Sequence, residues 1–368
     1  MLYENFKKGI NIGGWLSQYE LIASQPLTEE SVKQHFETFI TEEDIKRISS
    51  WQFDHIRLPL SGYLVYNRER DCLDGLALEY IHRCVNWCSK YHLNMVLDLH
   101  DVPGNVYGAM EQIMPLLGND VLQEQFIRIW ELLAKEFLNT TGIIIMFELL
   151  NEVSDAGGAY PSGDVKGNNY DFSHKELLPW NKLYKKCIRK IQSIDPERWV
   201  LVGSNGQNSV VYLKELEIID NPYVFYNFHY YEPQVFTHQQ AGFSEEMREF
   251  NRVISYPGDI SAFAAYLNEN PRWKGKHALV AEELRNDKAL MERLLEYAAG
   301  FIHDTGKELY CGEFGVIANT PAGDAKRWLN DLTEIFNRNH IGYALWNYKC
   351  LDFGLLGFDG KPCSNLLL

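Results

Sequence analysis

The segment Ile143-Ile144-Ile145-Met146-Phe147-Glu148-Leu149-Leu150-Asn151 is apolar at nearly every position. A short continuous apolar run without alternation is typical of a parallel strand that is covered on both faces. Similar runs recur along the chain at Gly9–Trp15, His55–Leu60, Asn94–His100, Arg198–Ser204, Tyr223–Tyr231, Glu308–Gly315 and Gly342–Tyr348. The sequence therefore contains eight candidate strands, each of which needs a covering layer.

Amphipathic stretches between these runs supply that layer. Apolar residues recur at spacings of three and four in Leu76–Tyr91, Val121–Leu138 and Asp324–Asn339, as expected for helices with one buried face. Strands that alternate with helices eight times are typical of an α/β fold of the (β/α)8 TIM barrel type. We therefore predict this barrel.

The chain has 368 residues, whereas such a barrel typically needs about 250. The surplus lies mainly in Val153–Ser173 and in Glu232–Lys307. The second segment carries helical patterns around Ser244–Val253 and Ile260–Asn268, before a further one at Asn286–Asp304. We predict one catalytic domain, residues 1–368, with a helical insertion at about 232–285 on the face where the strands end.

Charge and composition exclude several partners. The chain carries 35 Lys and Arg against 50 Asp and Glu, and nucleic-acid binding relies on basic residues. It has no apolar run of about eighteen residues that could span a membrane. We expect a monomer that binds neither nucleic acid nor membrane. The seven cysteines form no CxxC pair, which indicates free thiols in a reducing compartment. With no secretion-signal pattern at Met1–Lys8, the cytoplasm is favoured over secretion with the signal removed.

The polar residues at the strand ends indicate the chemistry, because (β/α)8 barrels place their active sites there. Glu152 and Glu313 each end a strongly apolar strand. An isolated carboxylate in that position would be costly to desolvate. Two carboxyl groups that face one cleft, one protonated and one ionised, are what glycoside hydrolysis requires.

Other chemistries have less support. The chain has no GxGxxG, GxxxxGK or HExxH motif, so nucleotide and zinc-protease functions lose their usual signature. His100, His229 and Asp101 could hold a metal, but a tight ligand spacing is missing. We predict no metal and no cofactor, and keep a metal-dependent hydrolase and a non-catalytic carbohydrate-binding barrel as alternatives. Glu148 is expected to form a buried ion pair rather than to act as the acid.

The ordered set of motifs, from Gly9-Ile10-Asn11-Ile12-Gly13-Gly14-Trp15 to Trp346-Asn347-Tyr348, resembles glycoside hydrolase family 5, the retaining cellulase-type barrels. The positions that match the motif residues of the family are Arg57, His100, Asn151, Glu152, His229, Tyr231, Glu313 and Trp346. The resemblance implies that Glu152 is the acid/base and Glu313 the nucleophile. It also implies that the other six residues bind the sugar or hold the glutamates.

Within the family, the stretches Tyr226–Tyr231, Thr237–Gln239 and Leu309–Gly315 resemble the bacterial endoglucanase C group. Two positions depart from the family pattern, because Val153 stands where many members have Pro and Asp101 where many have His or a small residue. The resemblance implies an endo-β-1,4-glucanase that acts on β-glucan or cello-oligosaccharides. A β-mannanase, a xylanase and an exo-β-1,3-glucanase remain as alternatives.

The aromatic residues divide into two groups. Some tryptophans fall within the predicted elements and are expected to pack in the core: Trp15, Trp51, Trp87, Trp130 and Trp328. Others fall in predicted loops and are candidate platforms for sugar rings: Trp180, Trp273, Tyr107 and Tyr160.

Overall fold

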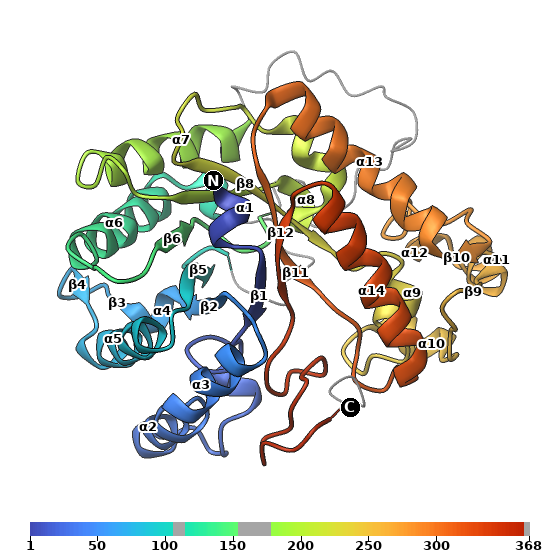
Figure 1. Ribbon diagram of the computed structural model, residues 1–368, viewed down its shortest axis with the longest axis horizontal. Helices are drawn as coiled ribbons and strands as arrows, with labels where there is room; N and C mark the ends of the chain where they lie inside the picture. The colour runs from blue at the N-terminus through green and yellow to red at the C-terminus, as the bar shows by residue number, and fades with distance from the viewer. Residues whose placement is uncertain (106–114, 154–177, 364–368) are drawn as a thin grey trace.

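A closed barrel of parallel strands forms the centre of the computed structural model (Figure 1). The structure describes residues 1–105, 115–153 and 178–363. The barrel strands are β1 (Lys8–Asn11), β2 (His55–Ser61), β5 (Asn94–Asp101), β6 (Ile145–Glu148), β7 (Val200–Gly203), β8 (Val224–Tyr230), β11 (Leu309–Phe314) and β12 (Gly342–Leu345). They are hydrogen-bonded in the order β1-β12-β11-β8-β7-β6-β5-β2, with β2 pairing back to β1. The predicted (β/α)8 barrel is confirmed.

Helices surround the barrel in the outer layer. The long ones are α2 (Glu29–Thr38), α3 (Glu42–Ser50), α5 (Gly75–Lys90), α6 (Asp120–Glu136), α7 (Pro179–Gln192), α13 (Lys288–Thr305) and α14 (Ala322–Arg338). Local sequence explains where several of them begin. The Asp74 side chain accepts from the backbone of Leu76 and Ala77 at the start of α5, and Asn119 caps α6 in the same way, which satisfies amide groups that a helix start leaves unpaired.

The regular alternation of strand and helix is interrupted. After β7 the chain forms only the short α8 (Asn205–Asn208) and a 3-10 helix, η4 (Val210–Glu215), before it enters β8. After β12 the described residues, which run to 363, contain no helix. The prediction of eight strand–helix alternations was therefore wrong at these two points. The remaining short elements are α1 (Leu2–Asn5), η1 (Tyr19–Leu21), α4 (Gly62–Val65), β3 (Tyr66–Asn67), β4 (Cys72–Leu73) and η2 (Pro115–Gly118).

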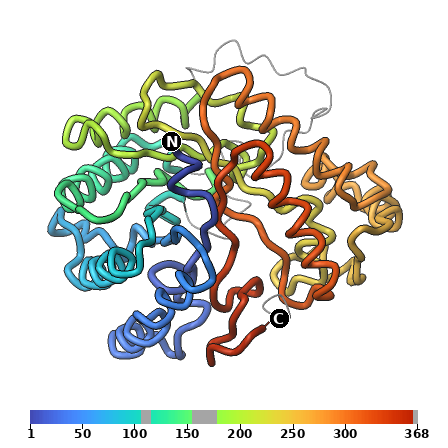
Figure 2. The backbone as a smooth tube through the Cα atoms, in the orientation of Figure 1, coloured from blue at the N-terminus to red at the C-terminus, as the bar shows by residue number. Residues whose placement is uncertain are grey.

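Residues 232–287 lie between β8 and α13 and form the extra helical segment. It contains α9 (Gln234–Thr237), α10 (Glu245–Phe250), β9 (Gly258–Asp259), α11 (Ser261–Glu269), α12 (Pro271–Lys274) and β10 (Arg285–Asn286). Figure 2 shows its outer part projecting to one side of the barrel, in yellow and orange. It is anchored to α14, where Arg327 donates to the Tyr256 carbonyl and the Tyr256 hydroxyl donates to Asp331.

Buried side chains fill the space between the barrel and the helices. Trp15, Trp130 and Trp328 are fully buried, and Trp51 and Trp87 pack against the same core, which confirms the packing role predicted for these five. Trp180 was wrongly assigned to a loop. It lies in α7, is 1% exposed, and donates its indole N–H to the Gly203 carbonyl. All seven cysteines are free thiols. None of the described helices is long and apolar enough to cross a membrane.

Candidate active site

Arg57, on β2, lies at the centre of the buried polar cluster and uses all three of its side-chain nitrogens. Nε and Nη2 donate to the two carboxylate oxygens of Glu148, at 2.7 and 2.9 Å. Nη2 also lies 3.0 Å from Asp98 Oδ2 and donates to the side-chain oxygen of Asn151. The third nitrogen, Nη1, donates to Asn11 and to Glu313. The predicted ion pair of Glu148 is confirmed. Arg57 reaches Glu313 as well, so it joins the structural pair to the site.

Glu313 lies on β11 and receives two donors. Arg57 Nη1 donates to Oε1 at 2.7 Å, and the Tyr231 hydroxyl donates to Oε2 at 3.0 Å. A Cβ on the preceding residue, Gly312, would lie 2.8 Å from Asn227 Nδ2 and 3.1 Å from His229 Nε2, so a larger residue there would displace side chains of the site. The carboxylate is thus fixed at both oxygens, and only 7% of the side chain is exposed.

Glu152 lies four residues beyond the end of β6 rather than on it. The predicted strand extended to Asn151, but β6 ends at Glu148, although the Leu149 and Asn151 amides still donate to carbonyls of the neighbouring strands. Glu152 has a φ of 44°, a left-handed conformation that costs energy in a residue with a side chain and is often found at functional sites. This turn aims the side chain at His229, whose Nδ1 lies 3.0 Å from Oε1. Burial raises the pKa of Glu152 to about 7.

The two glutamates face each other closely. One oxygen of Glu152, one oxygen of Glu313 and a ring nitrogen of His229 all lie within 4.8 Å of one another. Such a triad could in principle hold a cation, but it differs from the set considered from the sequence, since His100 and Asp101 are not part of it. The pair can also act on one bond without a metal. Glu152, which keeps its proton near neutral pH, can supply a proton, and the opposite carboxylate, Glu313, can act as a nucleophile.

His229 is held as a neutral ring. Its Nε2 lies 3.1 Å from the amide of Asn208, which follows β7, while Nδ1 faces both glutamates. Burial lowers its pKa to about 4, so the imidazole carries no charge at neutral pH. A neutral ring can orient Glu152 without adding a positive charge, which would favour loss of the proton from Glu152.

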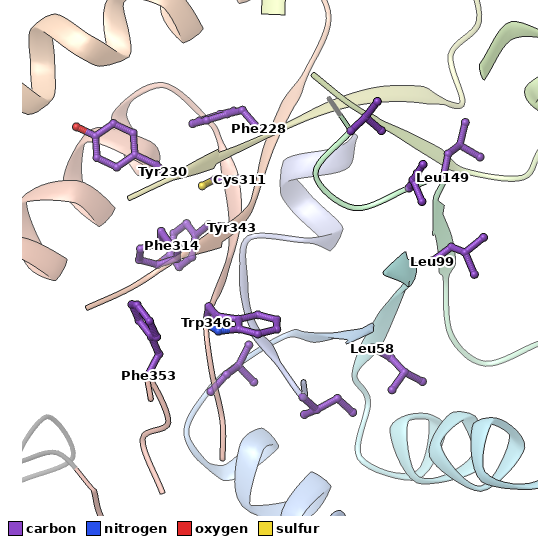
Figure 3. Packing of buried hydrophobic residues seen from close by; sticks show 14 of the residues in the cluster. Leu58, Leu99, Leu149, Phe228, Tyr230, Cys311, Phe314, Tyr343, Trp346 and Phe353 are labelled. Carbon is purple, nitrogen blue, oxygen red and sulfur yellow. The ribbon is translucent and has the colours of Figure 1, made fainter. Parts of the chain in front are cut away.

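His100 and Trp346 form a further wall of the site. His100 Nδ1 lies 2.7 Å from Asp98 Oδ2, and the His100 ring stacks on Trp346 at 5.7 Å with an interplanar angle of 4°. Figure 3 shows Trp346 within the same buried cluster as Phe314 and Phe353. Burial lowers the pKa of His100 and raises that of Asp98 to about 7. Asp98, which was not among the predicted site residues, thus connects His100 to Arg57.

The family model for cellulase, glycosyl hydrolase family 5, matches residues 22–350 of the chain. The chain belongs to glycoside hydrolase family 5. The protein is therefore a glycoside hydrolase, as its motif set predicted. It is 37% identical over 367 residues to Endoglucanase C of Acetivibrio thermocellus, and the match covers 99% of this chain and 97% of that protein.

One further relative and one solved structure are also similar to the chain. Cellodextrinase A of Ruminococcus flavefaciens is 31% identical over 334 residues, which are 91% of this chain and 83% of that protein. The structure of Thermotoga maritima Cel5A in complex with cellobiose superimposes with a TM-score of 0.68 at 18% identity, over 96% of this chain and 93% of that one. The structural likeness supports the barrel fold.

The eight residues predicted for this family 5 site come together, with Arg57 as the third residue of β2 and the other seven at or just beyond the carboxyl ends of their strands. The side-chain oxygen of Asn151 accepts a hydrogen bond from Arg57 Nη2. Tyr231, the residue after β8, donates its hydroxyl to Glu313. Asp101, one of the two departures, lies at the end of β5. It accepts from the Ser61 hydroxyl at 2.7 Å, and burial raises its pKa.

Sequence reasoning missed the buried polar residues that hold this set in place. Asn11 connects Arg57 to the carbonyls of Gly312 and Ala344, and Asn227 bridges Glu148 and the Gly312 amide. The signal that could have found Asp98 and Asn227 is the alternation along a strand, because Asp98 shares a face with His100 and Asn227 with His229. Tyr107 and Tyr160 lie outside the described residues. Trp273 was predicted to lie in a loop but lies on α12, and its platform role stays a prediction.

We expect Arg57→Lys to destabilise the protein strongly. A lysine ammonium cannot reproduce the planar, multi-donor geometry of the guanidinium, and the buried Asp98 and Glu148 would lose their cation. Breaking a buried pair typically costs about 3–5 kcal/mol. Urea unfolding measures this loss, with Arg272→Lys, an exposed pair with Glu249, as the control. A loss in Arg57→Lys as small as in the control would contradict the central role of Arg57.

Proposed function

We propose that this protein is a retaining endo-β-1,4-glucanase that hydrolyses β-glucan or cello-oligosaccharides. The observation that carries the proposal is the spacing of Glu152 and Glu313, whose nearest side-chain oxygens lie within 4.8 Å. Retaining glycosidases hold their two carboxyl groups about 5–5.5 Å apart, whereas inverting enzymes leave about 6.5–9.5 Å for a water molecule. The short separation therefore supports direct attack by one of the two carboxylates.

In the first step, Glu313 attacks the anomeric carbon of the sugar and forms a covalent glycosyl-enzyme. The glycosidic bond breaks, and its oxygen leaves with the proton that Glu152 supplies. Two contacts support these roles. Arg57 and Tyr231 each donate to one oxygen of Glu313 and hold it in place for the attack, and burial raises the pKa of Glu152 to about 7, so that Glu152 keeps its proton below that pH.

In the second step, Glu152 is a carboxylate and takes a proton from a water molecule. The oxygen of that water attacks the anomeric carbon, the bond to Glu313 breaks, and the product keeps the original anomeric configuration. His229 Nδ1, 3.0 Å from Glu152, holds the carboxyl group in place through both steps. Because the His229 ring is neutral, it does not favour either protonation state of Glu152, which must first donate a proton and then accept one.

The remaining residues are proposed to bind the sugar. Asn151, held by Arg57, would contact the 2-hydroxyl, an interaction that strengthens in the transition state. Trp346 would form the floor under the pyranose ring, and His100, fixed by Asp98, would contact sugar hydroxyls. These roles follow from the resemblance to the family and agree with the placement of the side chains around the two glutamates.

The preference for β-1,4-glucan rests on the relatives named above, an endoglucanase and a cellodextrinase. The decisive experiment compares initial rates on carboxymethylcellulose, lichenan, laminarin, mannan and xylan, and follows product lengths over time. We expect the highest rate on carboxymethylcellulose or lichenan, with products of intermediate length first. Highest activity on mannan, xylan or laminarin would replace the glucanase by the corresponding alternative. NMR of the first-formed anomer tests retention, and an inverted product would overturn the mechanism.

Three finer features belong to the same proposal. The chain acts as a single catalytic domain that includes the insertion at about 232–285, and it works as a monomer. Its seven free cysteines fit a reducing compartment, so we propose that it acts in the cytoplasm on short oligosaccharides. Light scattering of the purified protein would show the monomer, and cell fractionation would show the compartment.

We predict that removing metal ions leaves activity unchanged. The two-glutamate mechanism needs no Lewis acid, because the proton comes from Glu152 and the attack from Glu313. Rates on carboxymethylcellulose should agree, within error, before and after incubation with excess EDTA followed by gel filtration. A loss that added divalent cations restore would instead assign the Glu152–His229–Glu313 triad to a bound metal.

A further inference from the structure

A row of rings leads outward from the nucleophile into the insertion. Tyr231, whose hydroxyl binds Glu313, meets His238 edge-on at 5.1 Å between ring centroids, and both rings contact Phe353 at 5.7 and 5.0 Å. His238 in turn meets Phe243 edge-on at 5.9 Å. Phe353 is buried, whereas Phe243 is 54% exposed. The row therefore begins beside the proposed reacting atoms and ends at solvent.

The backbone that carries these rings is held in place. The Thr237 hydroxyl donates to the Tyr231 carbonyl, and the Ile317 amide, beyond β11, donates to the Thr237 carbonyl. Gln239 is buried and bonds to Ile254 of the insertion and to Thr320 in the loop before α14. The Thr237-His238-Gln239 motif thus fastens the start of the insertion to the loop that follows the strand of Glu313.

The turn that presents Phe243 is also fixed. Arg248 Nη1 donates to the Gly242 carbonyl at 2.8 Å, and the Ser244 hydroxyl accepts from the Met247 amide as the cap of α10. An apolar residue just before a helix cap often packs against the fourth helical residue. That residue here is Arg248, whose guanidinium instead binds the Gly242 carbonyl. Helix capping therefore does not account for the phenylalanine.

We propose that Phe243 is the platform of an outer sugar-binding subsite, which receives a pyranose unit of the β-glucan chain beyond those bound next to Glu152 and Glu313. The insertion would thereby lengthen the substrate-binding surface. This inference rests on the proposed function. A flat exposed ring suits the apolar face of a pyranose, and burying that face against it is favourable.

His238 is a positioning residue in this arrangement. Its ring lies between Tyr231 and Phe243 and supports the edge of each. Burial, with smaller contributions from Lys276 and His277, lowers the pKa of His238 to about 3. The ring therefore stays neutral at working pH, and the row presents an uncharged surface to a neutral sugar.

The test compares Phe243→Ala with the unaltered protein on cellotriose, cellotetraose, cellopentaose and cellohexaose. We expect kcat/KM to fall by about tenfold on the longer oligosaccharides, which corresponds to about 1.4 kcal/mol of lost binding, and to stay unchanged on the shortest. The bond that is cleaved in reducing-end-labelled cellohexaose should also shift. Phe243→Trp should keep the dependence on length, because it keeps a flat ring.

The control is Leu138→Ala, which removes an exposed apolar side chain just after α6. The carboxyl end of α6 lies at the opposite face of the barrel, so no change is expected at any length. An equal loss on all four oligosaccharides in Phe243→Ala, or no loss on any, would overturn the subsite. If the unaltered protein cleaved no glucan at all, the proposed function itself would fail, and the two failures are therefore distinguishable.

Discussion

Glu313→Gln is expected to lower kcat on cellotetraose by about 10⁴-fold or more, because an amide cannot form the glycosyl-enzyme and removal of a catalytic nucleophile has effects of this size. The fold should persist, since the amide oxygen can still accept from Arg57 or Tyr231. Circular dichroism and single-turnover rates measure the two properties separately.

Two further variants sharpen this result. Glu269→Gln, an exposed glutamate on α11, should keep full activity and serves as the matched control. In Glu313→Ala, added azide should restore cleavage of an activated aryl cellobioside and give the glycosyl azide of inverted configuration, because the small anion occupies the space of the lost carboxylate. Substantial activity of Glu313→Gln on cellotetraose would show that another residue is the nucleophile.

Glu152→Gln is expected to lower kcat on cellotetraose by about 10²–10⁴-fold, the usual contribution of a general acid. Its pH profile should change as well. In the unaltered protein the protonated form of Glu152 is the active one in the first step, so activity should fall as pH rises through about 7, the raised pKa of this group. In the variant this alkaline limb should disappear, since glutamine does not titrate.

A substrate whose leaving group needs no proton provides the control for the Glu152 variant. An aryl cellobioside with an acidic phenol needs no proton to depart, so burst release of the phenol should remain fast while the second step slows. Glu148→Gln is unsuitable as a comparison, because Glu148 pairs with the buried Arg57, whereas Glu269→Gln leaves the site intact. An alkaline limb that persisted in Glu152→Gln would assign the acid to another group.

The barrel could be predicted from the sequence because its strands are continuous apolar runs, and burial on both faces requires such runs. The errors have local causes. Trp180 was placed in a loop, although Pro179 begins α7, where a proline is well tolerated because its missing N–H would be unpaired in any case. The absent helix after β7 could not be seen, since buried residues of η4 such as Val210, Val211 and Leu213 are as apolar as those of a helix.

The site could be predicted where residue type and strand position coincide, as for Glu313 at the end of an apolar strand. Glu152 was found for the same reason, but its turn and its φ of 44° depend on hydrogen bonds to neighbouring strands that no local pattern reveals. Asn11 and Asn208 were missed for a related reason. Each acts through a partner more than 20 positions away in the chain, so the role of each asparagine can be recognised only once the barrel is folded.

The many contacts of Arg57 also bear on how such an enzyme can change over evolutionary time. One guanidinium contacts acidic groups from β5, β6 and β11, so replacing any one of them alters the charge balance felt by the others. We therefore expect the polar cluster around Arg57 to tolerate single substitutions poorly. New substrate preferences would have to arise in the segments above it, where a ring such as Phe243 can be gained or lost without disturbing the reacting groups.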